Sequence, residues 1–331
     1  MPRTARPVTE DELIAEILAP LAGGPAHALD DDCAHIPPGQ LAAGAIVTMD
    51  TLVAGVHFFA DDPPGLVAKK ALRVNLSDLA AKAARPRGYL LSLALPKECG
   101  ADWVRAFASG LAEDQSAYDV SLWGGDTVST PGPLTITITA IGTPSDGGTP
   151  LRSGARAGDA VMVTGTIGDA ALGLKALSDA DFAAGLTEDE RQTLIGRYRL
   201  PDPRVGFLDT VAASVTAAMD VSDGLVLDLS RMAAASGCGA ELDLVAVPLS
   251  SAVARLAEGD ESLREAAATG GDDYEILFTV AEAALPALDA HAAASGLAVT
   301  RVGTMTHAGG LRILDGEGRE VHPASLGYRH M

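Results

Sequence analysis

Apolar and polar residues follow two periods along this chain, about 2 and about 3.6 residues, which predicts strands and helices in alternation. The segment "TEDELIAEILAPLA" opens with a capping box from Thr9 to Glu12 and continues with apolar residues at helical spacing. The segments "AIVTMD", which ends at Asp50, "GYLLSLALP" and "TITITAIG" have the character of strands. Helices are expected over residues 65–84, with a polar interruption at 75–78, and over residues 101–118.

Residues 143–159 are rich in Gly, Pro and Ser, a composition typical of a linker. We therefore predict an N-terminal domain over residues 1–148 and a C-terminal domain over residues 149–331. Both periods occur in each half, which favours an α+β fold of two α/β domains over one doubly wound sheet. Beyond the linker we expect strand "AVMVTG", helices through residue 216, strand "AAMDVS", helix "GLVLDLSRMAAAS", strand "AELDLV" and strand "YEILFTV".

Composition limits the classes of function. The chain has 331 residues, more than one hydrophobic core usually supports, and a net charge of −20 from 44 acidic and 24 basic residues. This charge argues against nucleic acid or an anionic membrane as a partner, and an anionic ligand would need bridging metal ions. The three cysteines lack a CxxC pair, and neither a signal peptide nor a transmembrane-length apolar run occurs, so we expect a cytoplasmic protein with free thiols.

Carboxylates recur in six clusters that share one pattern. In each cluster Asp follows or ends an apolar stretch of strand character, with Gly, Ser or Thr beside it. Such hard oxygen ligands suit Mg²⁺, which usually takes one or two carboxylates together with substrate phosphates. Any single cluster is more often a helix cap or a turn, since Asp favours both, but six clusters in one chain favour a functional explanation. The clusters are "ALDDDCAHI", "VTMDTLVAGVH", "VNLSDLA", "LWGGDTVS", "AMDVSDGLVLD" and "TGGDDYEILF".

Familiar phosphate-binding and catalytic motifs are missing from the sequence. It contains neither a P-loop nor the catalytic-loop and D-F-G motifs of protein kinases. The segment "VTGTIGDAALG" has a glycine turn, but its spacing differs from the dinucleotide fingerprint, so we interpret it as structural. The seven histidines show no metal-ligand spacing, but His57, seven residues after Asp50, lies just downstream of an acidic strand end.

Eight motifs together resemble the bacterial thiamine-monophosphate kinase family in order and approximate spacing, over nearly the whole chain. The resemblance implies an N-terminal sheet that forms a homodimer, a C-terminal α/β domain and an ATP site in the cleft between the domains. It also implies transfer of phosphate from ATP to thiamine monophosphate, giving thiamine diphosphate, with several Mg²⁺ ions. The motifs are "DDCA", "DTLVAGVHF", "ALRVNLSDLAAKAARP", "WGGDT", "RSGARAGD", "VTGTIGDAALGL", "DVSDGL" and "GGDDYEI".

The same resemblance implies roles for individual residues. His57 and Asp272 resemble the contacts to thiamine phosphate. Gly125, Asp126, Arg152 and Ser222 resemble the contacts to ATP. Two alternatives stay open: Arg152 could form an ordinary interdomain salt bridge, and Asp223 could simply cap the helix "GLVLDLS". The residues that resemble Mg²⁺ ligands are Asp32, Thr48, Asp50, Asp78, Asp126, Asp220 and Asp223.

The chain also departs from the family pattern. Ala28, Leu29 and Asp30 replace the usual Gly-Ile-Gly, and Met49 replaces a hydroxyl residue, so a metal contact at Met49 would need its backbone carbonyl. Ser325 occupies a position where an aromatic residue commonly stacks on the substrate, and Asp272 replaces Glu. These positions leave two alternatives open: another ATP-dependent synthetase of the superfamily that includes aminoimidazole ribonucleotide synthetase, or a non-catalytic sensor of nucleotides or divalent cations.

Because the acceptor phosphate of thiamine monophosphate is already ionised near neutral pH, the predicted reaction needs no catalytic base. The difficulty lies in bringing two polyanions together, and metal ions held between carboxylates and phosphates overcome it. We therefore predict direct in-line transfer without a phosphoenzyme, with Asp78 bridging more than one metal ion.

Overall fold

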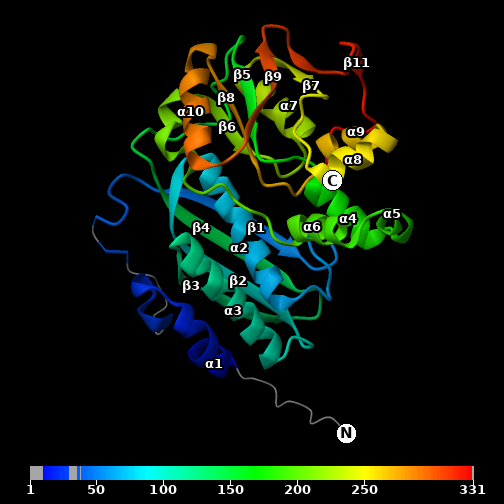
Figure 1. Cartoon of the computed structure of the whole chain (residues 1–331). Coiled ribbons are helices and arrows are strands. Elements are labelled where there is room, and N and C mark those ends of the chain that lie inside the picture. Colours follow the sequence, from blue (N-terminus) through cyan, green and yellow to red (C-terminus); the bar gives the residue numbers. More distant parts are fainter. Residues whose placement is uncertain (1–9, 30–35, 38, 330–331) are drawn as a thin grey trace. The chain divides into compact units, whose positions relative to one another are not determined.

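The computed structural model describes residues 10–29, 36–37 and 39–329. The described chain divides into two compact units. Unit 1 comprises residues up to 79 together with 84–144, and unit 2 comprises residues 80–83 together with 145–331. Each unit combines a sheet with helices, so the fold is α+β, as predicted (Figure 1).

Unit 1 is built on a four-stranded sheet of order β1-β4-β2-β3. β4 pairs antiparallel with both β1 and β2, whereas β2 and β3 run parallel. One sheet face carries buried Leu and Ile residues, because side chains in a strand alternate between the two faces. The strands are β1 (Ile46–Val53), β2 (Ala84–Pro96), β3 (Ser121–Thr130) and β4 (Thr135–Pro144).

Two long helices lie across the buried face of this sheet, α2 (Pro64–Ala81) and α3 (Ala101–Tyr118) (Figure 1). The predicted bounds of α3 are confirmed, but the predicted interruption of α2 at residues 75–78 is wrong. Asn75 is fully buried there, and its side-chain amide donates to the carbonyl of Ala71 at 3.0 Å. Satisfied in this way, a polar residue costs the helix little.

The first helix is shorter and less regular than predicted. α1 (Glu10–Leu13) passes into a π-helical turn, η1 (Ile14–Leu18), and then into two 3₁₀ segments, η2 (Ala19–Leu21) and η3 (Gly24–Leu29). Between η2 and η3 the chain touches the outer edge of β3, where the Gly23 amide donates to the Leu122 carbonyl at 2.7 Å. Thr9, the predicted capping residue, lies outside the described residues.

The other face of the unit 1 sheet bears apolar side chains that remain exposed. Val47, Met49, Leu90 and Val128 expose between 38% and 63% of their surface. Part of this face borders a cavity of about 740 Å³, which Ile14 of the N-terminal segment also lines. Contiguous apolar surface of this kind is typical of interaction surfaces and of ligand-binding grooves.

Unit 2 contains a seven-stranded mixed sheet of order β11-β10-β7-β9-β5-β8-β6. Strands β5 and β8 are buried throughout because helices cover both faces. Val161 and Val163 face α7, whereas Met162 faces the side of α10. The strands are β5 (Ala160–Thr164), β6 (Val215–Asp220), β7 (Gly239–Asp243), β8 (Ile276–Val280), β9 (Val299–Thr306), β10 (Gly310–Leu314) and β11 (Glu320–Val321).

The prediction of helices through residue 216 is wrong at its end, because β6 begins at Val215. β9, β10 and β11 and the helices α8, α9 and α10 were not predicted. The helices of unit 2 are α4 (Asp169–Ser178), α5 (Ala180–Ala184), α6 (Glu188–Arg199), α7 (Leu225–Ser236), α8 (Ser251–Gly259), α9 (Ser262–Thr269) and α10 (Leu285–Ser295), with 3₁₀ turns η4 (Phe207–Thr210), η5 (Ala212–Ser214) and η6 (Glu282–Ala284).

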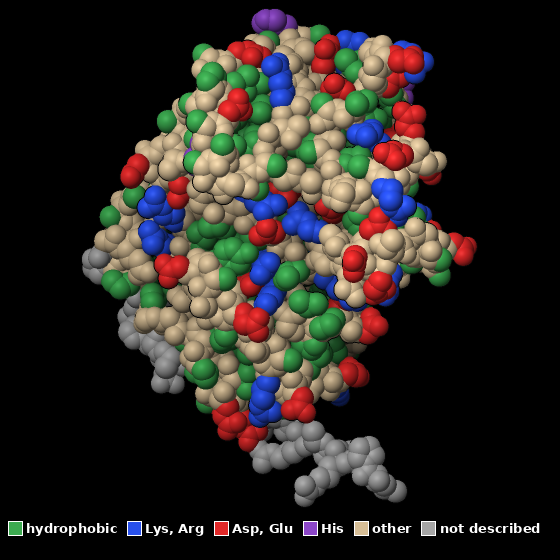
Figure 2. All heavy atoms as spheres, in the orientation of Figure 1, with side chains coloured by type: hydrophobic (Ala, Val, Ile, Leu, Met, Phe, Trp, Pro, Cys, Tyr) green, Lys and Arg blue, Asp and Glu red, His purple; other side chains and the backbone are tan. Residues whose placement is uncertain are grey.

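The charged side chains of the described residues do not separate by sign on the face shown in Figure 2. Lys and Arg side chains lie among Asp and Glu side chains there, so the acidic excess forms no single patch on that face. Among the described residues, no helix is both long enough and apolar enough to span a membrane.

The contact between α2 and α3 provides a test of this packing. A Cβ at Gly110 would lie 2.3 Å from the carbonyl oxygen of Gly65, whereas a Cβ at Gly65 would meet nothing closer than 3.4 Å. Gly110→Ala should therefore lower the free energy of unfolding by about 1–3 kcal/mol through overpacking. Gly65→Ala is the matched control and should stay close to wild type in urea denaturation. Equal losses in the two variants would contradict this packing.

Candidate active site

The first group of predicted residues lies where β1 meets α2 in unit 1. The Thr48 hydroxyl donates to the carboxylate of Asp78, which lies within α2 and not in a turn as its pattern suggested. The Asp50 amide donates to the side-chain oxygen of Asn75 at 3.1 Å. Asn75 therefore joins strand and helix at the level of these residues, and three of the predicted metal-binding residues lie on these two elements.

Gly125 and Asp126 lie inside β3 and not at a strand end. A Cβ at Gly125 would lie 1.8 Å from the carbonyl oxygen of Leu91, so only glycine fits this close strand pair. Asp126 is exposed and stands in register with Ser92 of β2, which is in register with Thr137 of β4. This row continues to β1 at Thr51, whose hydroxyl lies 2.8 Å from that of Thr137.

Asp50 and Asp126 cannot bind one metal ion within a single chain. β1 and β3 are the two outer strands, three strand spacings apart, which is about 14 Å. A Mg²⁺ ion lies only about 2.1 Å from each ligand oxygen, which is far short of this gap. Asp126 also belongs to the row next to that of Asp50, and adjacent rows face opposite sides of a sheet.

His57 lies in the turn that follows β1. Its Nδ1 accepts a hydrogen bond from the Val53 amide at 3.0 Å, and its carbonyl accepts one from the Lys70 ammonium at 3.0 Å. The accepting Nδ1 requires the other ring nitrogen, Nε2, to carry the proton. The turn thus fixes both the position and the tautomer of this side chain.

The second group of predicted residues forms two adjoining turns in unit 2. Asp220 ends β6 and is buried, and Ser222 and Asp223 follow it. The amides of Ser222 and Asp223 both donate to one carboxylate oxygen of Asp228, at 3.1 and 3.0 Å. Asp228 lies in the first helical turn of α7. It therefore holds the backbone of the turn at residues 220–223 from inside unit 2.

The second turn carries Asp272 and is bonded directly to the first. The Asp272 amide donates to the Ser222 carbonyl at 2.8 Å, and the Tyr274 amide donates to the Val221 carbonyl at 2.8 Å. Asp272 and Tyr274 both have left-handed backbone angles, φ 72° and 53°, which non-glycine residues rarely adopt. The left-handed Tyr274 also explains why β8 begins at Ile276 and not, as predicted, at Tyr274.

Buried carboxyl groups support both turns. The pKa of Asp228 is raised to about 6, mainly by burial and also by the charge of Asp223. The hydrogen bond from the Asp223 amide and the guanidinium of Arg231 oppose this rise. Burial also raises the pKa of Asp273 well above its ordinary value, and the neighbouring Asp169 adds to this. Arg231 forms ion pairs with both Asp223 and Asp228 and offsets part of the negative charge.

The remaining predicted residues lie apart from these turns or outside the described chain. Arg152 is exposed. The adjacent Leu151 carbonyl accepts from the Ala218 amide of β6 at 2.8 Å. Asp32 and the altered position Asp30 lie outside the described residues.

The C-terminal segment of the chain packs against the first turn. The Tyr328 amide donates to the Asp223 carbonyl at 2.9 Å, and Tyr328 remains 48% exposed. The hydroxyl of Ser325 donates to the Gly327 carbonyl at 2.8 Å and so serves the local turn. Tyr328 is therefore an aromatic residue beside the predicted site that the sequence analysis missed by considering only position 325.

Comparison with known proteins identifies the family. Models of the AIR synthase related protein match residues 30–143 with the N-terminal domain and residues 156–316 with the C-terminal domain. A thiamine-monophosphate kinase of Caulobacter vibrioides is 44% identical over 98% of this chain and 92% of its own length. That of Escherichia coli K12 is 41% identical over 84% of this chain and 83% of its own length. The chain belongs to the thiamine-monophosphate kinase family.

Solved structures agree with this family membership. The crystal structure of thiamine-monophosphate kinase from Stenotrophomonas maltophilia K279a is 36% identical with a TM-score of 0.79, over 88% of this chain and 91% of that one. AaThiL, complexed with AMPPCP and TMP, is 28% identical with a TM-score of 0.75, over 97% of this chain and 94% of that one.

The raised pKa of Asp228 predicts a specific pH dependence. Because the folded state holds this proton more tightly than the unfolded chain, the contribution of Asp228 to stability falls as the pH rises from about 4 to about 6. Asn cannot ionise, so Asp228→Asn should gain stability relative to wild type over that interval, by about 3 kcal/mol in total. Urea denaturation in EDTA from pH 4 to 7 measures the difference, and a difference independent of pH would contradict the assignment.

Proposed function

We propose that this chain transfers the γ-phosphate of ATP to thiamine monophosphate and so forms thiamine diphosphate. The observation that carries the proposal is the bonded pair of turns in unit 2, which places Ser222 and Asp223 beside Asp272. By family resemblance the first two residues serve nucleotide and metal, and Asp272 serves thiamine phosphate. The complex of AaThiL with AMPPCP and TMP supports this choice of substrates.

The oxygen ligands that the predicted residues offer fit Mg²⁺ as the ion that joins protein and phosphates. The β1 and α2 group offers one hydroxyl and two carboxylates, from Thr48, Asp50 and Asp78. Asp220 and Asp223 offer two more. Among the described residues no group of three acidic, His or Cys side chains could hold a metal ion alone, so a bound ion would need further ligands such as substrate phosphates.

The chemistry requires alignment and charge neutralisation from these residues. Bound Mg²⁺ would offset the negative charge of the phosphates and so lower the barrier to their approach. Thiamine monophosphate needs no general base, because its phosphate has a second pKa of about 6 and is largely ionised at neutral pH. The residues would hold the acceptor oxygen in line with the γ-phosphate for a single displacement, without a phosphoenzyme.

The sheet geometry leads us to propose a homodimer. Within one chain Asp50 and Asp126 are too far apart to share a metal ion, and the open sheet face exposes Met49, Leu90 and Val128. A second copy that packs on this face would bury these side chains. It would also place Asp126, which lies on this face, against the other copy.

The activity itself is tested with the purified protein, Mg·ATP and thiamine monophosphate. We expect thiamine diphosphate and ADP in equal amounts, detected by chromatography. ATP hydrolysis without thiamine diphosphate, or no turnover, would reject the proposed function. A parallel reaction with thiamine in place of its monophosphate should give no product, because the acceptor phosphate is then missing.

Asp78→Asn distinguishes two possible roles of Asp78, that of a metal ligand and that of a residue that only stabilises α2. Asn keeps the size and one acceptor oxygen for Thr48 but removes the charge, so the fold should survive while turnover at limiting Mg²⁺ falls. A loss of about 3 kcal/mol of transition-state stabilisation corresponds to more than a hundredfold in rate. The control Asp119→Asn removes an exposed carboxylate that ends α3 in a left-handed conformation, which Asn tolerates. Near wild-type turnover by Asp78→Asn would exclude the metal role.

Mixing two inactive variants tests whether one site takes Asp50 and Asp126 from different copies. Asp50→Asn and Asp126→Asn should each lose activity as homodimers. A mixed dimer carries both changes at one site and neither at the other, so unfolding and refolding equal amounts together should restore about a quarter of wild-type activity. If the site lay within one chain, every site would keep one defect, and the mixture would stay inactive.

A further inference from the structure

In the turn that carries Asp272, half-buried and fully buried side chains alternate along the chain, and family resemblance assigns no role to the buried ones. Asp272 and Tyr274 are half-buried, and the Tyr274 hydroxyl lies 3.3 Å from the Asp272 carboxylate, so their side chains point the same way. Asp273 and Glu275 are at most 1% exposed. The turn therefore directs two side chains outwards and two carboxyl groups into unit 2.

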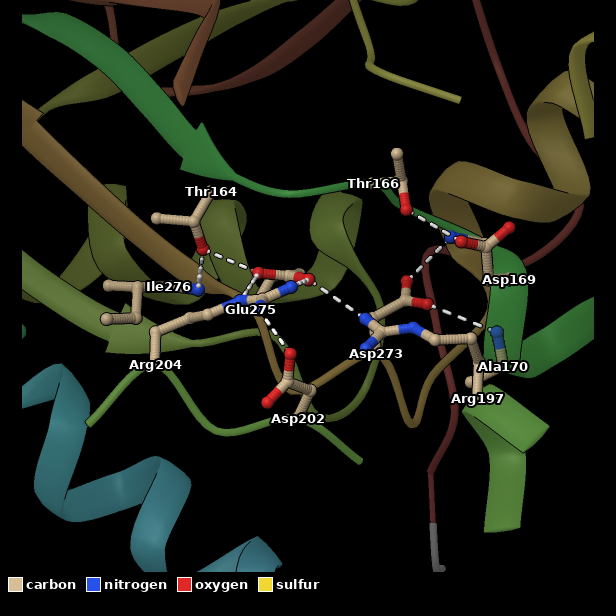
Figure 3. A network of polar contacts seen from close by, with 11 residues as sticks. Thr164, Thr166, Asp169, Ala170, Arg197, Asp202, Arg204, Asp273, Glu275 and Ile276 are labelled. Atoms are coloured by element: carbon tan, nitrogen blue, oxygen red, sulfur yellow. Dashed lines mark hydrogen bonds and ion pairs between the residues drawn. The ribbon is translucent and has the colours of Figure 1, made fainter. Parts of the chain in front are cut away.

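Glu275 occupies the centre of a buried charge network (Figure 3). Its carboxylate accepts from the Thr164 hydroxyl at 2.7 Å and from the guanidinium groups of Arg197, at 2.9 Å, and Arg204, at 2.7 Å for Nε. Arg204 also pairs with Asp202. Two carboxylates thus face two guanidinium groups, and a buried charge with this many partners is fixed in place.

The surrounding backbone is shaped to admit the Glu275 carboxylate. A Cβ at Gly165 would lie 2.2 Å from Glu275 Oε1, and Gly165 has a left-handed φ of 60°. Only glycine therefore fits beside the carboxylate without strain. The backbone of Glu275 also joins the two turns, since its carbonyl accepts from the Val221 amide at 2.8 Å.

Asp273 provides a second anchor on the same side of the turn (Figure 3). Its carboxyl group accepts from the Gly168 amide at 2.7 Å and from the Ala170 amide at 3.3 Å, at the beginning of α4. Tyr274 lies between Asp273 and Glu275, and Asp272 precedes Asp273. Asp272 and Tyr274 both have left-handed backbone angles, which cost free energy and persist only when the surrounding structure imposes them.

We propose that Glu275, held by Arg197 and Arg204, is a positioning residue that sets Asp272 towards the substrate. Glu275 does not touch substrate; it imposes the left-handed backbone and, through Val221, the spacing between the two turns. This inference rests on the proposed function for the identity of the substrate. The fixed orientation of Asp272 before any ligand binds is a separate consequence that needs no substrate to test.

Two measurements on Glu275→Gln test the role. In ligand-free protein, hydrogen exchange of the Asp272 and Tyr274 amides should accelerate, because their bonds to Ser222 and Val221 depend on the anchor. In steady-state kinetics the KM for thiamine monophosphate should rise about tenfold, with a much smaller change in kcat. The control Glu241→Gln removes another Glu–Arg ion pair of unit 2, to Arg312, and should change neither measurement.

A double-mutant cycle distinguishes positioning from general destabilisation. Asp272→Asn removes the proposed substrate contact and keeps a residue that tolerates left-handed angles. If Glu275 acts through Asp272, then Glu275→Gln should raise the KM less than about twofold further in the Asp272→Asn background. Equal fold increases in both backgrounds, an unchanged KM, or unchanged amide exchange would overturn the proposal.

Two further arrangements keep the test decisive. If Glu275→Gln does not fold, Arg197→Gln removes one partner only and should show the same pattern with smaller changes. If wild-type protein makes no thiamine diphosphate, the proposed function fails, and the exchange measurement alone still decides whether Glu275 fixes Asp272.

Discussion

Three backbone hydrogen bonds between two turns of unit 2 are the constraint on which the candidate site depends. They join Asp272 to Ser222, Tyr274 to Val221, and Val221 to the Glu275 carbonyl. These bonds require close approach: a Cβ at Gly271 would lie 2.5 Å from the Ser222 carbonyl oxygen. Two segments about fifty residues apart in sequence therefore present their acidic side chains as one surface.

Negative charge at this surface needs compensation, because two carboxylates about 5 Å apart repel by roughly 3 kcal/mol at an effective dielectric of 20. The fold provides it in three ways. Arg231 pairs with Asp223 and Asp228, backbone amides donate to Asp228 and Asp273, and two arginines surround Glu275. Buried carboxyl groups, those of Asp228, Asp273 and Glu275, thus hold the backbone of the turns. The carboxylates proposed to bind metal and substrate lie on these turns.

Local patterns predicted part of this arrangement. The helix at 101–118 and the strand cores of unit 1 followed from periodicity, since each has one apolar face. The Asp clusters marked the turns at 220–223 and 272–275 because Gly and Asp are typical of turns. Family resemblance, and not periodicity, supplied the individual roles of these residues.

Other features depend on tertiary contacts that no local pattern encodes. Asn75 was expected to interrupt α2, because the group that its side chain bonds, the Asp50 amide, lies 25 residues away in the sequence. β3 was missed because Gly124 and Gly125 resemble a turn, although close approach of Leu91 requires glycine there. The separation of Asp50 from Asp126 follows from strand order, which the sequence does not reveal. Glu275 looked like an ordinary strand residue until Arg197 and Arg204 were placed around it.

In the proposed function the acidic residues receive phosphate groups through a divalent cation. Calorimetric titration of the purified protein with ATP, once in excess Mg²⁺ and once in EDTA, tests this dependence. Binding should be measurable in Mg²⁺ and weak or absent in EDTA, because unshielded carboxylates repel the polyphosphate. Equal affinity under the two conditions would contradict it.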